Sequence, residues 1–119
     1  MGKKILLVDD DGECRAMLAG ILKRSAYEVV MAKDATEALA QAEESELGLI
    51  VLDLNLNGES GLVLMKFLKR NHPEVPILIY TALNHQEDEV KTLLQQGASQ
   101  YLKKGSPEEL VKAVKRSFR

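Results

Sequence analysis

The chain lacks features that several classes of protein require. Its 119 residues include one cysteine, no tryptophan and three prolines. The single cysteine, Cys14, excludes an intrachain disulfide and suits a reducing compartment. No apolar run approaches the roughly 20 residues that a membrane-spanning helix needs, and none has the form of a secretion signal. We therefore expect a cytoplasmic protein without a membrane partner.

The chain also lacks a large excess of either positive or negative charge. Lys and Arg number 16, Asp and Glu number 18, and the net charge is −2. Without a basic field, direct binding to nucleic acid is not expected. Hydrophobic residues make up 45% of the chain and charged residues 29%, which is ordinary for a soluble globular protein. The length suits one domain, so we expect residues 1–119 to form a single unit with its own core.

Five apolar runs alternate with helical patterns along the chain. The runs, which predict strands, span residues 3–8, 27–31, 49–52, 76–80 and 99–103. Capping residues predict helix starts at Asp11, Asp34 and Ser106. Another helix is expected from Asn84 and Glu87 onward. Five strand–helix units predict a doubly wound α/β fold of the flavodoxin-like kind, in which a five-stranded parallel sheet of order 2-1-3-4-5 carries helices on both faces.

Apolar spacing within the helices predicts which side chains face the sheet. The residues expected on the inner faces of the first and fourth helices are Met17, Leu18, Ile21, Leu22, Val90, Leu93 and Leu94. The two histidines, His72 and His85, are far apart in the sequence and have no neighbours at ligand spacing. Both are therefore expected to be solvated.

Polar residues end several of the predicted strands. In the order 2-1-3-4-5 the first and third strands are neighbours, so their carboxyl ends meet at one rim of the sheet. The polar residues at the strand ends are Asp9, Asp10, Asp53, Thr81, Lys103 and Lys104. Several of them also have a local alternative, since Asp53 suits a turn, residues 9–11 suit an acidic helix start, and Thr81 suits a helix cap.

Three carboxylates at one rim need positive charge nearby. Two unit charges about 4 Å apart repel by roughly 4 kcal/mol at an effective dielectric constant near 20. A lysine supplies one counter-charge, and Mg²⁺, which binds carboxylate, carbonyl and water oxygens, is the simplest second one. An Asp carboxylate beside Mg²⁺ and Lys can attack phosphorus as a nucleophile. Thr81 would then hydrogen-bond one phosphoryl oxygen, and the lysine would pair with another.

These residues resemble a known family in order and spacing. The segments VDD at 8–10, LD at 52–53, TA at 81–82 and GASQYLKK at 97–104 are similar to the receiver domain of two-component response regulators, including chemotaxis receivers. The resemblance implies a phosphorylation-dependent switch that accepts a phosphoryl group from a histidine kinase or phosphotransfer protein. It also implies that the chain supports its own phosphorylation and dephosphorylation without being a turnover enzyme.

The resemblance implies a role for each acidic residue of the rim. Asp53 is the expected phosphoacceptor and also a metal ligand. Asp10 is the expected direct ligand of Mg²⁺, and Asp9 acts on the metal through water. The backbone carbonyl of Asn55 matches the position that completes the metal site.

The remaining roles fall on the fourth and fifth strands. Thr81 matches the switch hydroxyl, and Tyr101 matches the aromatic residue that changes rotamer with it. Lys104 lies three residues after Tyr101, which is the family spacing for the phosphate-pairing lysine, and the adjacent Lys103 is the alternative. Phosphorylation is expected to repack the face formed by the fourth helix, fifth strand and fifth helix. That face would bind a partner, an output domain or a second copy in a homodimer.

Two positions depart from the family pattern. Asn57 stands where many members have proline, but Asn57 and Gly58 together favour a turn. Gly105 follows Lys104, where many members have a proline in a cis peptide. We expect a trans bond or a compromise made easy by glycine, because a cis bond to a residue other than proline costs about 3 kcal/mol.

Two other classes of function fit parts of the sequence. A receiver-like interaction module that takes no phosphate would have the same fold. A phosphohydrolase with an Asp nucleophile would also place an acid after a buried strand, but such enzymes use Asp-x-Asp, and here Asn55 stands two residues after Asp53. Both a stand-alone receiver and a receiver within a longer protein are compatible with the 119 residues.

Overall fold

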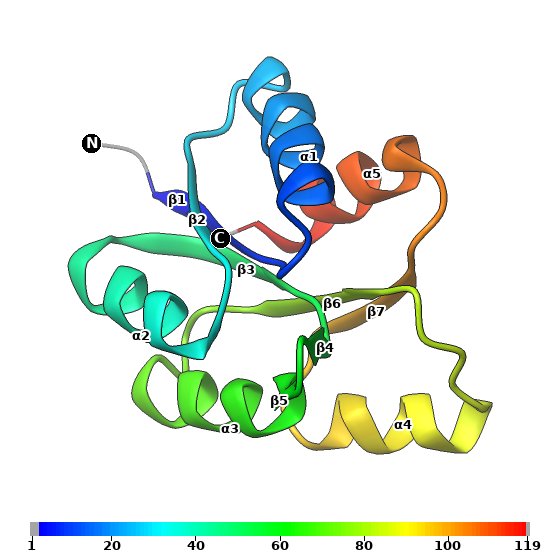
Figure 1. Cartoon of the computed structure of the whole chain (residues 1–119). Helices are drawn as coiled ribbons and strands as arrows, with labels where there is room; N and C mark the ends of the chain where they lie inside the picture. Colours follow the sequence, from blue (N-terminus) through cyan, green and yellow to red (C-terminus); the bar gives the residue numbers. More distant parts are fainter. Residues whose placement is uncertain (1–2, 119) are drawn as a thin grey trace.

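A parallel sheet lies between two layers of helices in the computed structural model, which describes residues 3–118 (Figure 1). The strands of this sheet are β1 (Lys4–Val8), β2 (Val29–Ala32), β3 (Leu47–Leu52), β6 (Ile77–Thr81) and β7 (Gln100–Lys103). They are all parallel, in the order β2-β1-β3-β6-β7. Numbered within this sheet, that order is 2-1-3-4-5, so the predicted flavodoxin-like topology is confirmed.

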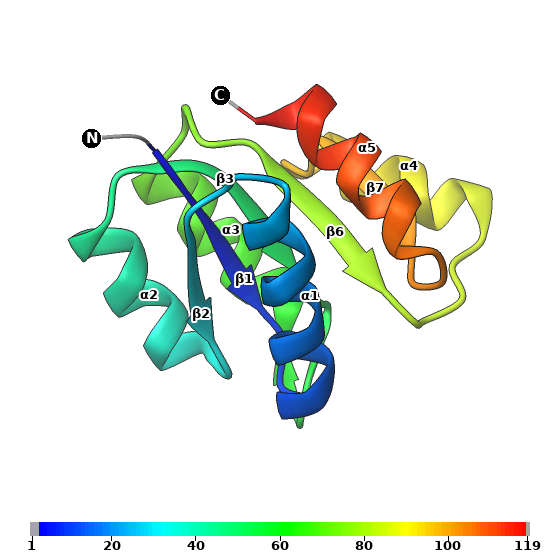
Figure 2. The same cartoon turned by 90° about the horizontal axis from the view of Figure 1, so that it is seen from above.

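Helices cover both faces of the sheet. The helices are α1 (Gly12–Arg24), α2 (Ala35–Glu44), α3 (Gly61–Asn71), α4 (Glu87–Gln95) and α5 (Pro107–Ser117). Figures 1 and 2 show α1 and α5 on one face and α2, α3 and α4 on the other. Among the helices of residues 3–118, none has both the length and the apolar composition that a membrane span requires.

Side chains of the central strands alternate between two cores. Leu6, Ile50 and Ile77 point to the core under α2, α3 and α4. Ile5 and Leu49 point to the core under α1 and α5. All six residues of β3 are buried, because helices cover both of its faces. This explains why its sequence is a continuous apolar run rather than an alternating one.

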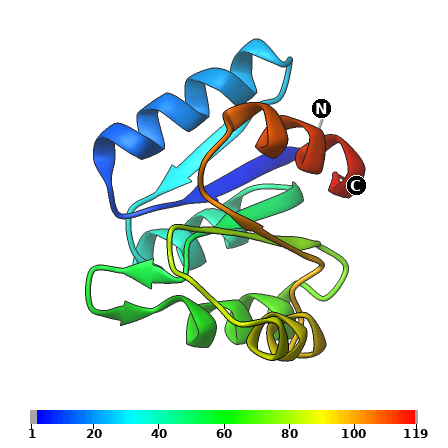
Figure 3. The same ribbon diagram turned by 90° about the vertical axis from the view of Figure 1, so that its right-hand side faces the viewer.

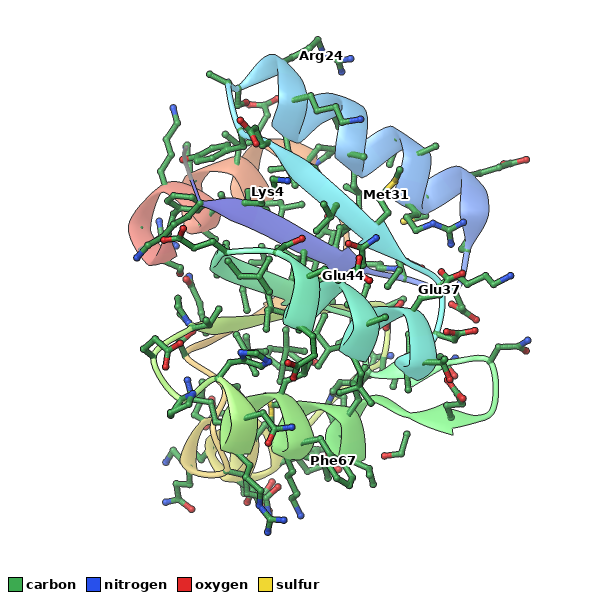
Figure 4. The ribbon with its side chains drawn as sticks, turned by 90° about the vertical axis from the view of Figure 1, so that its left-hand side faces the viewer. Lys4, Arg24, Met31, Glu37, Glu44 and Phe67 are labelled. Carbon is green, nitrogen blue, oxygen red and sulfur yellow. The ribbon has the colours of Figure 1, made fainter. Side chains whose placement is uncertain are left out.

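Three of the helix caps that the sequence predicts are present. The Asp11 carboxylate accepts hydrogen bonds from the first turn of α1. The Asp34 carboxylate accepts from the N–H of Glu37, which Figure 4 labels on α2. Ser106 accepts from the N–H of Glu109 at the start of α5. Each cap satisfies a backbone donor that a helix start would otherwise leave unpaired.

The helix expected from Asn84 and Glu87 onward starts at the second of these two residues. The helix begins at Glu87, after the N-cap residue Gln86, whose N–H donates to Glu89 Oε1 at 2.7 Å. Asn84 lies in the preceding loop, where its side chain accepts a hydrogen bond from Lys103 Nζ. The helix start is therefore capped by a glutamine and glutamate pair, and Asn84 takes no part in it.

The faces of α1 and α4 that were predicted to be buried are wider than the faces buried in the structure. Met17 is 52% exposed and Leu94 is 40% exposed, although both were expected to face the sheet. A helix buries only the side chains that point at the sheet, and residues at the margin of an apolar stripe remain in solvent. Phe67 on the outer side of α3 is likewise 51% exposed (Figure 4).

A short hairpin interrupts the passage from β3 to α3. It consists of β4 (Asn55–Leu56) and β5 (Glu59–Ser60), which pair antiparallel. Asn57 and Gly58 have φ angles of 51° and 92°, so both central residues of the turn lie in the positive-φ region that a type I′ hairpin needs. Figure 3 shows this hairpin in green, projecting from the body of the molecule. The Asn57 and Gly58 turn was predicted, but the strand pairing on either side of it was not.

Candidate functional site

The acidic residues of β1 and β3 meet at one rim of the sheet. The N–H of Asp9 donates to Ala32 O, and the N–H of Asp53 donates to Val8 O, so backbone pairing continues past the strand ends. Asp9 is 1% exposed and Asp53 is 7% exposed, whereas Asp10 is exposed. One carboxylate oxygen from each of these three residues lies within 4.8 Å of the others.

Lys104 joins two of the carboxylates. Its Nζ lies 2.8 Å from Asp9 Oδ2 and 2.8 Å from Asp53 Oδ2. The N–H of Lys104 donates to Thr81 O at 2.7 Å, which holds the residue just past the end of β7. Lys103 is exposed and turns to Asn84 instead. Of the two lysines that the sequence offers, Lys104 is therefore the one against the acids.

Lys104 keeps its positive charge firmly. Burial alone lowers its pKa, but the hydrogen bonds and negative charges of Asp53 and Asp9 outweigh burial, and the pKa of Lys104 rises above its ordinary value. Within residues 3–118 every peptide bond is trans, including the bond from Lys104 to Gly105. Lys104 thus reaches the rim without the proline that many family members have after it.

The other oxygens of the buried acids have backbone partners. Asp9 Oδ1 accepts from the N–H of Asp11 at 3.0 Å, and Asp53 Oδ1 accepts from the N–H of Asn55 at 3.1 Å. Arg15 Nη1 donates to the backbone oxygen of Asp9 at 2.7 Å. These contacts fix the orientation of both carboxylates before any ligand binds.

The oxygens of the cluster suit a hard divalent cation. Carboxylate oxygens are the ligands that Mg²⁺ prefers, and Mg²⁺ keeps several waters, which a half-open site allows. Here two acids are buried and oriented, and the third, Asp10, faces solvent. Asn55, two residues after Asp53, begins β4, and its backbone N–H donates a hydrogen bond to the Asp53 carboxylate. The described residues therefore fit Mg²⁺.

Thr81 and Tyr101 lie on neighbouring strands and are linked through one residue. Thr81 ends β6 and is fully buried. The N–H of Leu83 donates to Thr81 Oγ1, and the Tyr101 hydroxyl donates to Leu83 O, each at 3.2 Å. The Tyr101 hydroxyl also contacts His85 Nδ1 at 2.6 Å. His85 was expected to be solvated, and it is half-buried with a hydrogen-bond partner in Tyr101. The spacing of the sequence could not indicate this contact, because it joins residues 16 positions apart.

His72, the other histidine expected to be solvated, is also half-buried. His72 Nε2 lies 3.6 Å from Glu43 Oε1 of α2, and its side chain is 20% exposed. This contact ties the end of α3 to the end of α2, and it is remote from the acidic rim.

Gly61 is a residue of the site region whose structural role was not predicted from the sequence. A Cβ at this position would lie 2.5 Å from Leu54 Cα and 2.7 Å from Asp53 O. The N–H of Gly61 donates to Leu54 O, so the first turn of α3 presses against the backbone that carries Asp53. Only a residue without a side chain allows this approach.

Gly61→Ala is expected to destabilise the fold by about 3 kcal/mol, because the atoms in its way are backbone atoms that cannot rotate aside. Gly20→Ala in α1 is the matched control, since its Cβ would meet only the tip of Arg24 at 3.5 Å. There the helix preference of alanine predicts a gain of up to about 1 kcal/mol. Urea unfolding of both variants measures the two changes. Equal stabilities would contradict the close approach at Gly61.

Comparison with known proteins identifies the family of this chain. The family model for the response regulator receiver domain matches residues 5–115. The chain therefore belongs to the response regulator receiver domain family. Members of this family are phosphorylation-dependent switches of two-component systems that bind Mg²⁺ at the acidic pocket, and they are generally not turnover enzymes. Histidine kinases phosphorylate the response regulators that carry these domains.

Individual relatives agree with the family assignment. The chain is 37% identical over its full length to the phosphate regulon transcriptional regulatory protein PhoB of Klebsiella pneumoniae, and 40% identical to the alkaline phosphatase synthesis transcriptional regulatory protein PhoP of Bacillus subtilis. These matches cover 53% and 50% of the two relatives, so the chain spans about half the length of the curated relatives it matches.

Solved structures show the same fold. The chemotaxis protein CheY4 of Vibrio cholerae superposes with a TM-score of 0.88 at 31% identity, covering 99% of this chain and all of that one. The response regulator TrrA of Thermotoga maritima, solved in complex with Mg²⁺ and BeF, gives a TM-score of 0.87 at 28% identity, covering 98% of this chain and all of that one.

Proposed function

We propose that the chain is a phosphorylatable receiver domain over residues 1–119, with Asp53 as its phosphoacceptor. The observation that supports this most directly is the position of Lys104, whose ammonium group lies 2.8 Å from both Asp53 and Asp9. A carboxylate held beside a fixed cation, and beside acids that can bind Mg²⁺, is oriented to attack phosphorus. Asp53 is the acid of this group that the hairpin orients, through the N–H of Asn55.

In the proposed transfer, an Asp53 oxygen forms a bond to phosphorus while the phosphorus–nitrogen bond of a donor phosphohistidine breaks. The electron pair of that bond stays on the imidazole of the donor. Bound Mg²⁺, held by Asp10, Asp53 and the Asn55 carbonyl and through water by Asp9, would neutralise negative charge on the transferred oxygens. Lys104 leaves its contact with the carboxylate oxygen and pairs with a phosphoryl oxygen.

The added negative charge is the proposed switch. A phosphoryl group carries more negative charge than the carboxylate it modifies, so it attracts the Thr81 hydroxyl and the Lys104 ammonium. Thr81 and Lys104 lie at the ends of β6 and β7, and the Thr81 hydroxyl is connected to Tyr101 through Leu83. We infer that this movement repacks the face formed by α4, β7 and α5. That face would then bind a partner, an output domain or a second copy of the chain.

Removing the metal is expected to stop phosphorylation. Incubation with radiolabelled acetyl phosphate and Mg²⁺ should label the chain with one acid-stable, base-labile and hydroxylamine-labile phosphoryl group, as expected for an acyl phosphate. Excess EDTA should reduce the label to background, because the three carboxylates would then lack the cation that offsets their charge. Labelling that is unchanged in EDTA would contradict the proposed metal dependence. No labelling with Mg²⁺ would favour an interaction module that takes no phosphate.

A further inference from the structure

His85 and Tyr101 form a contact beside the proposed switch hydroxyl. His85 Nδ1 lies 2.6 Å from the Tyr101 hydroxyl oxygen, and the two rings meet edge to face with centroids 5.4 Å apart. His85 lies in the loop between β6 and α4, whereas Tyr101 lies in β7. The contact therefore ties the loop that follows Thr81 to the strand at the edge of the sheet.

The Tyr101 hydroxyl has two partners but only one proton to donate. It donates to Leu83 O at 3.2 Å, so it must accept the proton of its second hydrogen bond. Burial and the carboxylate of Glu89 raise the pKa of Tyr101, which keeps the hydroxyl protonated. The arrangement is satisfied when His85 Nδ1 carries a proton and donates it to the Tyr101 oxygen.

The contact continues into the proposed phosphoryl site. The N–H of Leu83 donates to Thr81 Oγ1, and its carbonyl accepts from Tyr101. One residue is thus held at both its N–H and its carbonyl, by the switch hydroxyl and by the tyrosine. The Thr81 hydroxyl uses a lone pair in this bond and keeps its own proton free for another acceptor.

We propose that His85 is a positioning residue for the switch, which donates to the Tyr101 hydroxyl and thereby directs that hydroxyl at the Leu83 carbonyl. The inference rests on the proposed function, in which Thr81 contacts the phosphoryl group. A loop that is already held in place loses less conformational freedom when Thr81 closes on a ligand. His85 therefore strengthens phosphoryl binding without touching the phosphoryl group.

His85→Phe tests the donor alone. Phenylalanine retains an aromatic ring against Tyr101 but has no hydrogen-bond donor. We expect about fivefold weaker binding of beryllofluoride in the presence of Mg²⁺, which is the effect of one neutral hydrogen bond on an equilibrium. NMR titration, followed at the amide signals of Thr81 and Leu83, measures the dissociation constant. His85→Gln restores an amide donor and is expected to recover part of the affinity. Affinity in His85→Phe that is unchanged or higher would overturn the proposal.

Tyr101→Phe separates positioning from a general structural effect. Tyr101→Phe removes the hydroxyl to which His85 would donate. His85→Phe should therefore cause no further loss of beryllofluoride affinity in the Tyr101→Phe background. The same fivefold loss in both backgrounds would show that His85 acts in another way, and would overturn the proposal.

The proton on His85 can be observed in the chain without any ligand. The sequence has two histidines, so ¹⁵N spectra of the imidazoles contain two sets of signals, and His72→Gln assigns them. We expect a protonated Nδ1 in His85 whose signal shifts in Tyr101→Phe. An unprotonated Nδ1, or an Nδ1 signal whose chemical shift is the same in Tyr101→Phe, would overturn the inference. If the wild-type chain bound no beryllofluoride, the proposed function would fail, and these spectra would still decide whether His85 donates to Tyr101.

Discussion

Asp53→Asn is expected to reduce Mg²⁺-dependent labelling by acetyl phosphate to background. The amide has nearly the shape of the carboxylate and can still accept from the N–H of Asn55, which bonds Asp53 Oδ1 at 3.1 Å. What it loses is the negative oxygen that forms the new bond to phosphorus. Lys104 keeps Asp9 as a partner, so the fold should remain intact. Acid-quenched samples on a gel measure the label, and a urea unfolding curve verifies the fold.

Asp11→Asn is the matched control for this result. Asp11 is a neighbouring acid of the same charge, but its carboxylate caps α1 and it does not belong to the cluster of Asp9, Asp10 and Asp53. Asparagine is as good an N-cap as aspartate, so this variant should fold and label normally. Labelling that persists in Asp53→Asn would assign the phosphoryl group to another acid, and peptide mapping would identify it.

Lys104→Met is expected to destabilise the metal-free chain by about 3 kcal/mol at neutral pH. The side chains of Asp9 and Asp53 are 2% and 9% exposed, and the variant would leave both carboxylates without their shared cation. Removing one partner of a buried ion pair lowers stability by more than the intact pair adds to it, because the remaining charge stays buried without a counter-charge. Methionine retains the apolar stem, so the loss would reflect the ammonium group. We also expect phosphorylation by acetyl phosphate to slow by about a hundredfold, as when one charge-stabilising donor is removed.

The same ion pairs predict how stability depends on pH. The pKa of Lys104 in the folded chain lies above its ordinary value of 10.5, so folding favours the protonated form. The stabilisation is complete below about pH 10.5 and is lost as pH rises through the folded-state pKa. The difference in unfolding free energy between wild type and Lys104→Met should therefore be constant at neutral pH and narrow above pH 10.5. Urea unfolding at several alkaline pH values measures this difference.

Lys103→Met is the control for both effects of Lys104→Met. Lys103 is exposed, and its ammonium group bonds Asn84 rather than an acid. Surface substitutions of this kind change stability by about 0.5 kcal/mol or less. A larger loss of stability or of phosphorylation in Lys103→Met than in Lys104→Met would move the proposed role to the neighbouring lysine.

The strand ends explain how much of the site the sequence could predict. Asp9 and Asp53 follow apolar runs directly, and parallel strands bring their carboxyl ends to one rim, so topology alone places the acids together. The same topology places the carboxyl end of β7 at the rim that carries Asp9 and Asp53. The choice between Lys103 and Lys104 needed side-chain directions, since adjacent residues point to different sides. The sequence favoured Lys104 from its distance to Tyr101, and the structure places its ammonium group between Asp9 and Asp53.

Other features depend on distances between parts of the chain that are far apart in sequence. Gly61 is needed because α3 starts against the backbone of Asp53 and Leu54, and a single glycine in a turn-rich segment does not indicate such contact. The contact of His85 could not be predicted from sequence spacing, because its partner Tyr101 lies 16 positions away. Met17 and Leu94 belong to apolar stripes, yet the sheet does not reach them.

The sequence by itself determined the order of strands and helices, the caps of α1, α2 and α5, and the identity of the acids at the rim. These properties arise from local periodicity and from hydrogen bonds within a few residues, which a linear sequence records. The tertiary structure alone decided where α3 must have no side chain and that a histidine contacts Tyr101, and it places the ammonium group of Lys104, the lysine favoured from the sequence, between two of the acids. Those properties depend on how separate elements pack, and packing distances are set by the whole fold rather than by neighbours in the chain.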